Sequence, residues 1–296
     1  MMSQHQNDRK SVWMNVASML IFGTIGIFRR SIPLPSAVLA CSRGLLGSLF
    51  IFLYSKLKKR SAASRLQAGT AALLAVSGAV MGANWILLFE AYRYTSVAIA
   101  TLCYYMQPTI VMLLSPLLFR EKLTLKKGIC AAAAVAGMVL VSGVIGGGPA
   151  GPGNLRGILL GLGAAVLYSA VVIMNKQVRG VDAYQKTTVQ LFSAGAVLIP
   201  YLLLTGGFSG LDFSGNTLLL VLVVGLLHTG IAYVLYFGSI DGLSIQSVAL
   251  LSYIDPVAAL LFSALFLKEP LSAAGILGAV MIIGSAVVSE TGKKNS

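Results

Sequence analysis

Long apolar segments separated by short polar ones run along almost the whole chain. Segments such as 66–89, 128–144 and 157–174 are predominantly apolar, and about 18 or more such residues can cross a bilayer as a helix. Backbone in lipid must satisfy its own hydrogen bonds, so spanning helices are expected wherever this pattern recurs. The pattern predicts an all-α membrane protein with ten transmembrane helices, at residues 11–32, 34–55, 68–91, 95–118, 127–145, 155–176, 184–205, 216–238, 244–267 and 271–289.

The pattern also repeats within the chain. Residues 105–123 match residues 253–271 at a constant offset of 148, with seven identities and no gap. Self-similarity of this kind is typical of a chain built from duplicated units. We therefore predict two five-helix repeats, 11–145 and 155–289, joined by a Gly/Pro-rich linker at 146–154.

Composition agrees with a membrane protein. The chain is 57% hydrophobic and 10% charged, with a mean hydropathy of +0.86, whereas a soluble domain carries about 25% charged residues. The net charge of +13 comes from short Lys/Arg clusters between spans and forms no basic stripe interleaved with aromatics, so we expect no nucleic-acid partner. Cys41, Cys103 and Cys130 all fall inside predicted spans and are read as small buried side chains.

The Lys/Arg distribution predicts the orientation. With the N-terminus in the cytoplasm, sixteen Lys/Arg residues face the cytoplasm and five face outward, as the positive-inside rule requires. We expect a multi-pass protein of the cell membrane with both termini cytoplasmic and no cleaved signal. Five helices per half make the second repeat enter from the opposite side, and inverted repeats are a known basis of alternating access.

Two charges lie deep inside predicted spans. Arg43 is nine residues from Leu34 and Asp255 is eleven from Ser244, roughly 13 Å and 16 Å at the helical rise. Such charges cost about 2.5–3.5 kcal/mol each to insert, so each needs a reason. Arg43 would hold a carboxylate or phosphate, and Asp255 an amine or a proton. The alternative is a purely structural pairing of the two.

A polar residue precedes proline at equivalent positions of both repeats, in Gln107-Pro108 and Asp255-Pro256. Each proline removes a backbone donor, so it kinks its helix and frees a carbonyl four residues earlier. We expect the polar faces of these helices to contribute to a substrate site, although a kink that only shapes packing is the alternative. The residues on these faces are Thr101, Tyr104, Gln107, Ser252 and Asp255.

Aromatic and amide side chains add further candidates. Trp85 and Tyr233 are repeat equivalents, with Asn84 beside the first, and could wall an apolar or cationic ligand. Tyr168 and Gln190 lie on neighbouring predicted helices. Plain packing explains most aromatics in spans, and it is the alternative for this group.

Three other features could serve either function or structure. His228 lies within a span and could couple transport to protons, as could Asp255, whereas a neutral histidine bonded to a neighbouring helix would be structural. Glu90 and Arg93 are spaced to form an interfacial pair. The small-residue motifs that start at Gly78 and Gly157 allow close helix approach, within the chain or in a homo-oligomer.

These features together resemble the drug/metabolite transporter superfamily, and specifically proteins with two EamA repeats. The resemblance rests on the paired segments 108–121 and 256–269, on residues 91–96 and on Arg43. It implies a central cavity surrounded by helices one to four and six to nine, with 127–145 and 271–289 at the periphery. Proteins of this kind move amino acids, other metabolites or drugs.

The favoured function is therefore a secondary transporter that exports an amino acid or a related amphipathic solute by alternating access. A multidrug, quaternary-amine or other metabolite transporter is the alternative. The chain contains no nucleotide-binding loop motif, and we expect no cofactor, no metal and no enzymatic activity. An intramembrane hydrolase using Ser209 and His228 is a remote alternative, as is a receptor or scaffold.

Overall fold

The computed structural model describes residues 2–58, 66–119, 124–141, 152–211, 214–240, 243, 245–270 and 272–290, and apart from turns and short connections these are helical. The first half contains α1 (Met2–Gly23), α2 (Ile25–Ser31), α3 (Ser36–Leu57), α4 (Ala68–Tyr94), α5 (Val97–Tyr104), α6 (Gln107–Phe119) and α7 (Leu125–Val141). The second contains α8 (Pro152–Gln177), α9 (Ala183–Ala196), α10 (Leu198–Leu204), α11 (Gly215–Gly225), the π-helical η1 (Leu226–Ile231), α12 (Ala232–Ile240), α13 (Ile245–Ser252), α14 (Ile254–Phe266) and α15 (Ala273–Glu290).

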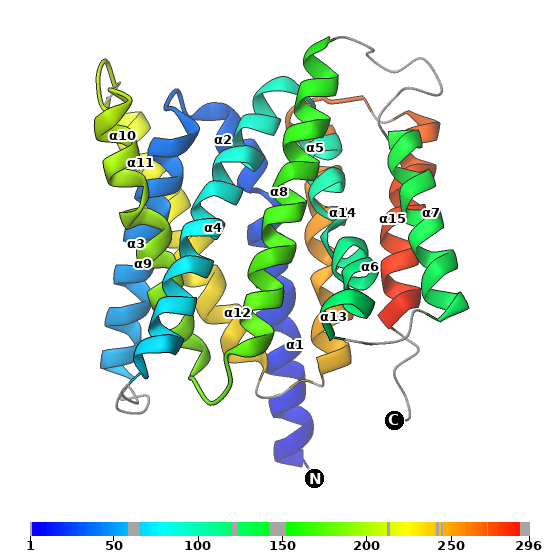
Figure 1. Ribbon diagram of the computed structural model, residues 1–296, viewed down its shortest axis with the longest axis horizontal. Coiled ribbons are helices and arrows are strands. Elements are labelled where there is room, and N and C mark those ends of the chain that lie inside the picture. The colour runs from blue at the N-terminus through cyan, green and yellow to red at the C-terminus, as the bar shows by residue number, and fades with distance from the viewer. Residues whose placement is uncertain are drawn as a thin grey trace.

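The helices run side by side between two ends of a bundle (Figure 1). In that view α1 begins at the lower end, where α8 and α15 finish, while α4 finishes and α5 begins at the upper end. We call these the lower and upper ends. Among the described residues, seven helical segments are long and apolar enough to cross a membrane, and Ile254–Phe266 and Ala273–Val288 are apolar but shorter.

Several helices predicted to be continuous are broken. The predicted helix 95–118 is divided into α5 and α6, and 244–267 into α13 and α14, each just before a proline. The predicted helix 216–238 contains η1. Helix α1 starts at Met2 rather than residue 11, because hydropathy detects only the apolar part of a helix that continues beyond it. Residues 142–151 of the predicted first repeat and linker, and the predicted loop residue Glu121, lie outside the described residues.

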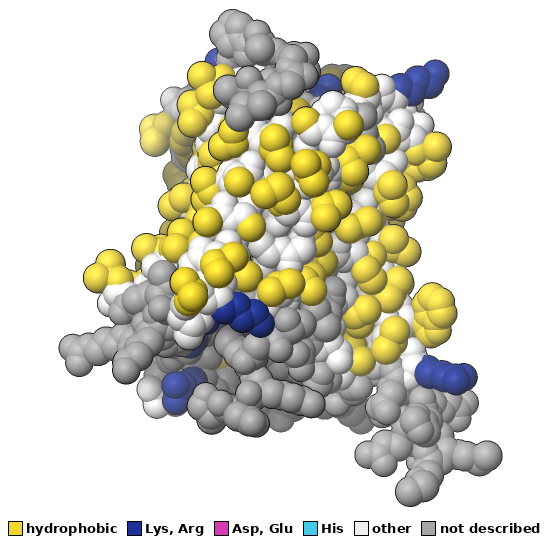
Figure 2. All heavy atoms as spheres, turned by 90° about the vertical axis from the view of Figure 1, so that its right-hand side faces the viewer, with side chains coloured by type: hydrophobic (Ala, Val, Ile, Leu, Met, Phe, Trp, Pro, Cys, Tyr) yellow, Lys and Arg dark blue, Asp and Glu magenta, His cyan; other side chains and the backbone are white. Residues whose placement is uncertain are grey.

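The outer surface is apolar, as a lipid-facing surface requires. Figure 2 shows hydrophobic side chains over the middle of one face, with Lys and Arg toward its two ends. Leu117 and Leu204 are 80% and 88% exposed, which would be costly in water. The bilayer is therefore the natural surroundings of this protein.

Close backbone contact holds α9 between α3 and α4. A Cβ on Gly78 would lie 2.4 Å from the carbonyl oxygen of Gln190, and a Cβ on Gly44 would lie 2.7 Å from the nitrogen of Gly195. A Cβ on Gly82 would likewise lie 2.7 Å from the carbonyl oxygen of Ala194. The motif that starts at Gly78 is therefore used within the chain, for packing of α4 on α9.

A second close contact joins α7 to α15 at one side of the bundle, on the right in Figure 1. A Cβ on Gly137 would lie 2.7 Å from the carbonyl oxygen of Gly278, and a Cβ on Gly278 would lie 2.5 Å from that of Gly137. Ala134 and Ile282 are buried on the same pair of helices. The fifth and last predicted helices thus pack on each other, away from the centre.

Candidate functional site

A cavity of about 580 Å³ lies among the helices and is lined from both halves of the chain. At the lower end its lining includes Lys127 in the first turn of α7 and Lys176 near the end of α8. Lys176 is exposed, so the cavity reaches the surface at that end. A volume of this size suits a small organic molecule.

Arg43 of α3 is the main cation in the cavity wall. Its side chain is buried, with the residue only 5% exposed, and its Cζ lies 4.1 Å from the ring centroid of Trp85. Its Nε donates a hydrogen bond to Thr229 Oγ1 at 3.0 Å. No other hydrogen bond or ion pair of this guanidinium occurs in the part of the chain that the structure describes. Its terminal nitrogens are therefore available to bind an anionic group.

The π-helix η1 positions Thr229 for this contact. The Thr229 hydroxyl donates to the carbonyl of Val224, five residues earlier, at 3.2 Å, and its oxygen accepts from Arg43. A Cβ on Gly47 would lie 2.3 Å from Thr229 Cγ2, so the glycine lets η1 approach α3. Single π-turns of this kind are frequent at functional sites.

Asp255 is the acidic group of the cavity wall. It lies in the first turn of α14, where the helix dipole favours a negative charge. Tyr105 donates a hydrogen bond from its hydroxyl to Asp255 Oδ2 at 2.6 Å. No ion pair joins Asp255 to Arg43 among the described residues, so the structural pairing considered from the sequence is not observed there.

Tyrosines make up much of the remaining wall. The rings of Tyr104 and Tyr168 are 5.5 Å apart, and Tyr233 packs edge-on against Phe22 at 5.3 Å. The Trp85 ring, in the same wall, is in cation–π contact with the Arg43 guanidinium. The site thus combines a buried guanidinium, a carboxylate and an aromatic wall, with Lys127 and Lys176 at its lower end.

The predicted site residues fall into two groups. The structure brings most of them to the cavity: Arg43, Trp85, Tyr104, Gln107, Pro108, Tyr168, Tyr233, Ser252 and Asp255. Asn84 and Pro256 are buried but do not line it. Asn84 donates its amide to the carbonyl of Ala164 at 2.5 Å and thereby joins α4 to α8. Gln190 donates to Ser77 and Asn175, again between helices.

His228 also lies away from the cavity wall. It is fully buried, its Nε2 lies 2.9 Å from Thr24 Oγ1, and its Nδ1 lies 3.4 Å from the carbonyl oxygen of Val223. Ser209 lies in the turn that follows α10 and is not among its partners. Ser209 and His228 therefore do not form the pair that the hydrolase alternative requires. Among the described residues, no cluster of His, Cys, Asp or Glu could hold a metal.

Sequence reasoning missed three side chains of this site. Tyr92 lines the cavity, and its hydroxyl lies 3.3 Å from Thr101 Oγ1. Tyr105 bonds Asp255, and Thr229 bonds Arg43. Of these three, only Tyr105 could have been singled out from the sequence, because its equivalent in the second repeat, Tyr253, is also a tyrosine. Side-chain direction at a helix break cannot be read from periodicity.

Comparison with known proteins gives the family. The family model described as "EamA-like transporter family" matches residues 9–143 and 155–291. Uncharacterized transporter YxxF of Bacillus subtilis (strain 168) is 30% identical over 292 residues, covering 95% of this chain and 90% of that protein. Protein PecM of Dickeya dadantii (strain 3937) is 31% identical over 211 residues, covering 69% of this chain and 67% of that protein.

The fold has a match among solved structures as well. A crystal structure superposes with a TM-score of 0.66 at 21% identity, over 94% of this chain and 96% of that chain, which supports the fold alone. The two family matches fall on the two halves recognised from the internal repeat. The chain is a multi-pass membrane protein, and it belongs to the EamA-like transporter family of the drug/metabolite transporter superfamily.

Proposed function

We propose that this protein is a secondary transporter that exports an amino acid or a related small zwitterion through the cell membrane. One observation carries the proposal: the buried Arg43 guanidinium lines the cavity without an acidic partner among the described residues. Arginine binds a planar carboxylate with two parallel hydrogen bonds. Asp255 in the same wall would receive the ammonium group.

The proposed topology has ten crossings in two inverted repeats, 11–145 and 155–289, with both termini in the cytoplasm. It is supported by the start of α1 and the finish of α15 at the same end (Figure 1). The broken helices α5–α6 and α13–α14 occupy equivalent positions of the two repeats, and discontinuous helices at mid-membrane commonly carry transporter binding sites. With the lower end facing the cytoplasm, the cavity is open inward, ready to load a substrate for export.

A ligand screen tests the substrate class. Purified protein is heated with amino acids, polyamines, sugars or quaternary amines, and the unfolding temperature is measured, because a ligand that binds the folded state raises it. We expect amino acids alone to stabilise the protein. Stabilisation by quaternary amines and not by amino acids would instead support the alternative of a cation or drug transporter.

Asp255→Asn is expected to weaken amino-acid binding about tenfold, since a hydrogen bond to a charged group contributes about 1.5–3 kcal/mol. Tyr105→Phe should have a smaller effect, because it removes only the donor that holds the carboxylate. Calorimetric titration with the amino acid and with its deaminated analogue measures both. If Asp255→Asn weakened binding of the two ligands equally, the ammonium assignment would be wrong.

The inverted topology predicts that equivalent connections of the two repeats face opposite sides. Lys126, in the first turn of α7 just after the first connection, and Lys268, in the connection between α14 and α15, are both exposed. In a background without Cys41, Cys103 and Cys130, Lys126→Cys should react with an impermeant thiol reagent only from the cytoplasmic side, and Lys268→Cys only from outside. Labelling of both from one side would contradict inversion.

A further inference from the structure

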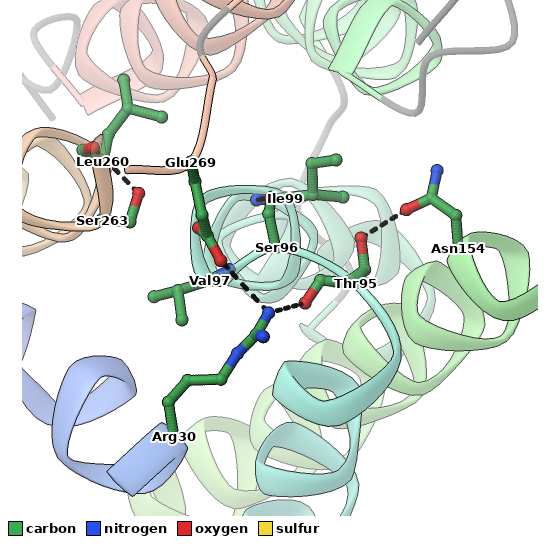
Figure 3. A network of polar contacts seen from close by, with 9 residues as sticks. All are labelled: Arg30, Thr95, Ser96, Val97, Ile99, Asn154, Leu260, Ser263 and Glu269. Atoms are coloured by element: carbon green, nitrogen blue, oxygen red, sulfur yellow. Dashed lines mark hydrogen bonds and ion pairs between the residues drawn. The ribbon is translucent and has the colours of Figure 1, made fainter. Parts of the chain in front are cut away.

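A polar network joins the two halves at the upper end (Figure 3). Glu269, between α14 and α15, accepts hydrogen bonds from the backbone N–H of Val97 at 2.9 and 3.1 Å. Arg30, at the end of α2, donates to Glu269 Oε1 at 3.1 Å and to the carbonyl of Thr95 at 2.7 Å. A carboxylate from the second half therefore caps α5 of the first half and pairs with a cation from α2.

The chain is turned sharply to make this contact. Lys268 has a φ of 54°, in the left-handed region that few non-glycine residues adopt. Such a conformation persists only where the surroundings stabilise it. The Glu269 side chain is 13% exposed, against 38% for Arg30, so the carboxylate is largely shielded from solvent. Partly buried, charge-assisted hydrogen bonds are stronger than exposed ion pairs.

The network lies beyond the cavity along three separate elements. Ile25 of α2 lines the cavity, and Arg30 is five residues farther along. Thr101 of α5 lines it, and Val97 lies four residues back toward the upper end. Ala259 of α14 lines it, and Glu269 follows ten residues later. None of the three network residues lines the cavity, and each lies farther toward the upper end than the lining residue of the same segment.

We propose that Arg30, Val97 and Glu269 form the gate that seals the outer end of the cavity. Release of Glu269 from the N-terminus of α5 frees the second half from the first and lets the cavity open outward. The gate is a two-state contact, since its hydrogen bonds stabilise the inward-open state alone. This inference rests on the proposed alternating access and orientation, and it makes no use of the substrate.

The test places a reporter cysteine in the cavity, Ile25→Cys, in a chain whose Cys41, Cys103 and Cys130 are alanine. The rate of reaction with an impermeant thiol reagent is measured in right-side-out and in inside-out vesicles. Glu269→Gln should raise the outside rate about tenfold and lower the inside rate, because removing charged contacts from one state shifts the equilibrium toward the other. Arg30→Gln should act in the same direction but less, because Val97 keeps its acceptor.

Arg93→Gln is the matched control. Arg93 pairs with Glu90 at 3.1 Å on α4, so its loss breaks an ion pair within one helix and leaves the contact between halves intact. It should change neither rate. Unchanged rates in Glu269→Gln, a rise on both faces as a loosened protein would give, or an equal effect of Arg93→Gln would each overturn the gate. Because no substrate is added, this result is separate from that of the ligand screen.

Discussion

Arg43→Ala should reduce amino-acid transport by about 100-fold in reconstituted vesicles, because a charge-assisted bidentate contact contributes up to about 3 kcal/mol. Arg43→Lys should recover little, since a lysine lacks the planar fork and cannot stack on Trp85 in the same way. Transport is measured as counterflow of a labelled amino acid. The effect should be specific to the carboxylate, so the amide or ester of the same amino acid should lose far less.

Arg156→Ala provides the control for this experiment. The Arg156 guanidinium also stacks on an aromatic ring, with its Cζ 4.2 Å from the centroid of Tyr94, but the residue does not line the cavity. Its removal deletes the same charge and one contact with an aromatic ring, but at an exposed position, and should leave transport near the parent rate. Full transport by Arg43→Ala, or equal losses for the free acid and its ester, would refute the carboxylate assignment.

Gly78→Leu should prevent α4 from packing on α9. Any Cβ at this position meets the Gln190 carbonyl at 2.4 Å and the Ser193 Cβ at 2.8 Å, and backbone cannot yield as a flexible side chain can. Overpacking of this kind costs on the order of 3 kcal/mol, which lowers the melting temperature by about 10 °C. Size-exclusion and thermal unfolding in detergent would measure the loss.

Gly284→Leu is the matched substitution. Gly284 is also within an apolar helix, α15, but nothing lies within 4 Å of a Cβ built there. Its melting temperature should remain close to that of the parent protein. Equal losses in the two variants would mean that helix propensity or insertion, and not the contact with α9, causes the effect.

Much of the fold was predictable because lipid restricts the choices. Apolar length identified helices, and the internal offset identified the two halves. Kinks were predicted at Pro108 and Pro256, but the sequence did not predict that each helix would stop there. At Tyr253 and Tyr105 the chain leaves the helix ahead of proline, and a proline alone does not say whether a helix bends or stops. The π-turn at η1 has no periodic signature.

For the site, charge was a better guide than aromatic or amide character. Arg43 and Asp255 line the cavity, as expected from the cost of a charge in lipid. Asn84 and His228 are also buried, yet they bond neighbouring helices. A polar side chain in a span must face protein, but the sequence does not say whether it faces a cavity or another helix. Glu269 was assigned to a loop, and its contact with the other half depends on tertiary structure.

The α7–α15 seam constrains how the protein can move. Gly137 and Gly278 bring two backbones together with no side chain between them to adjust, so sliding or twisting there would cause immediate collision. Because each helix comes from a different half, the seam ties both halves at the edge of the bundle. We expect α7 and α15 to move together as one rigid body. The core helices of the two halves would then rotate about this pair.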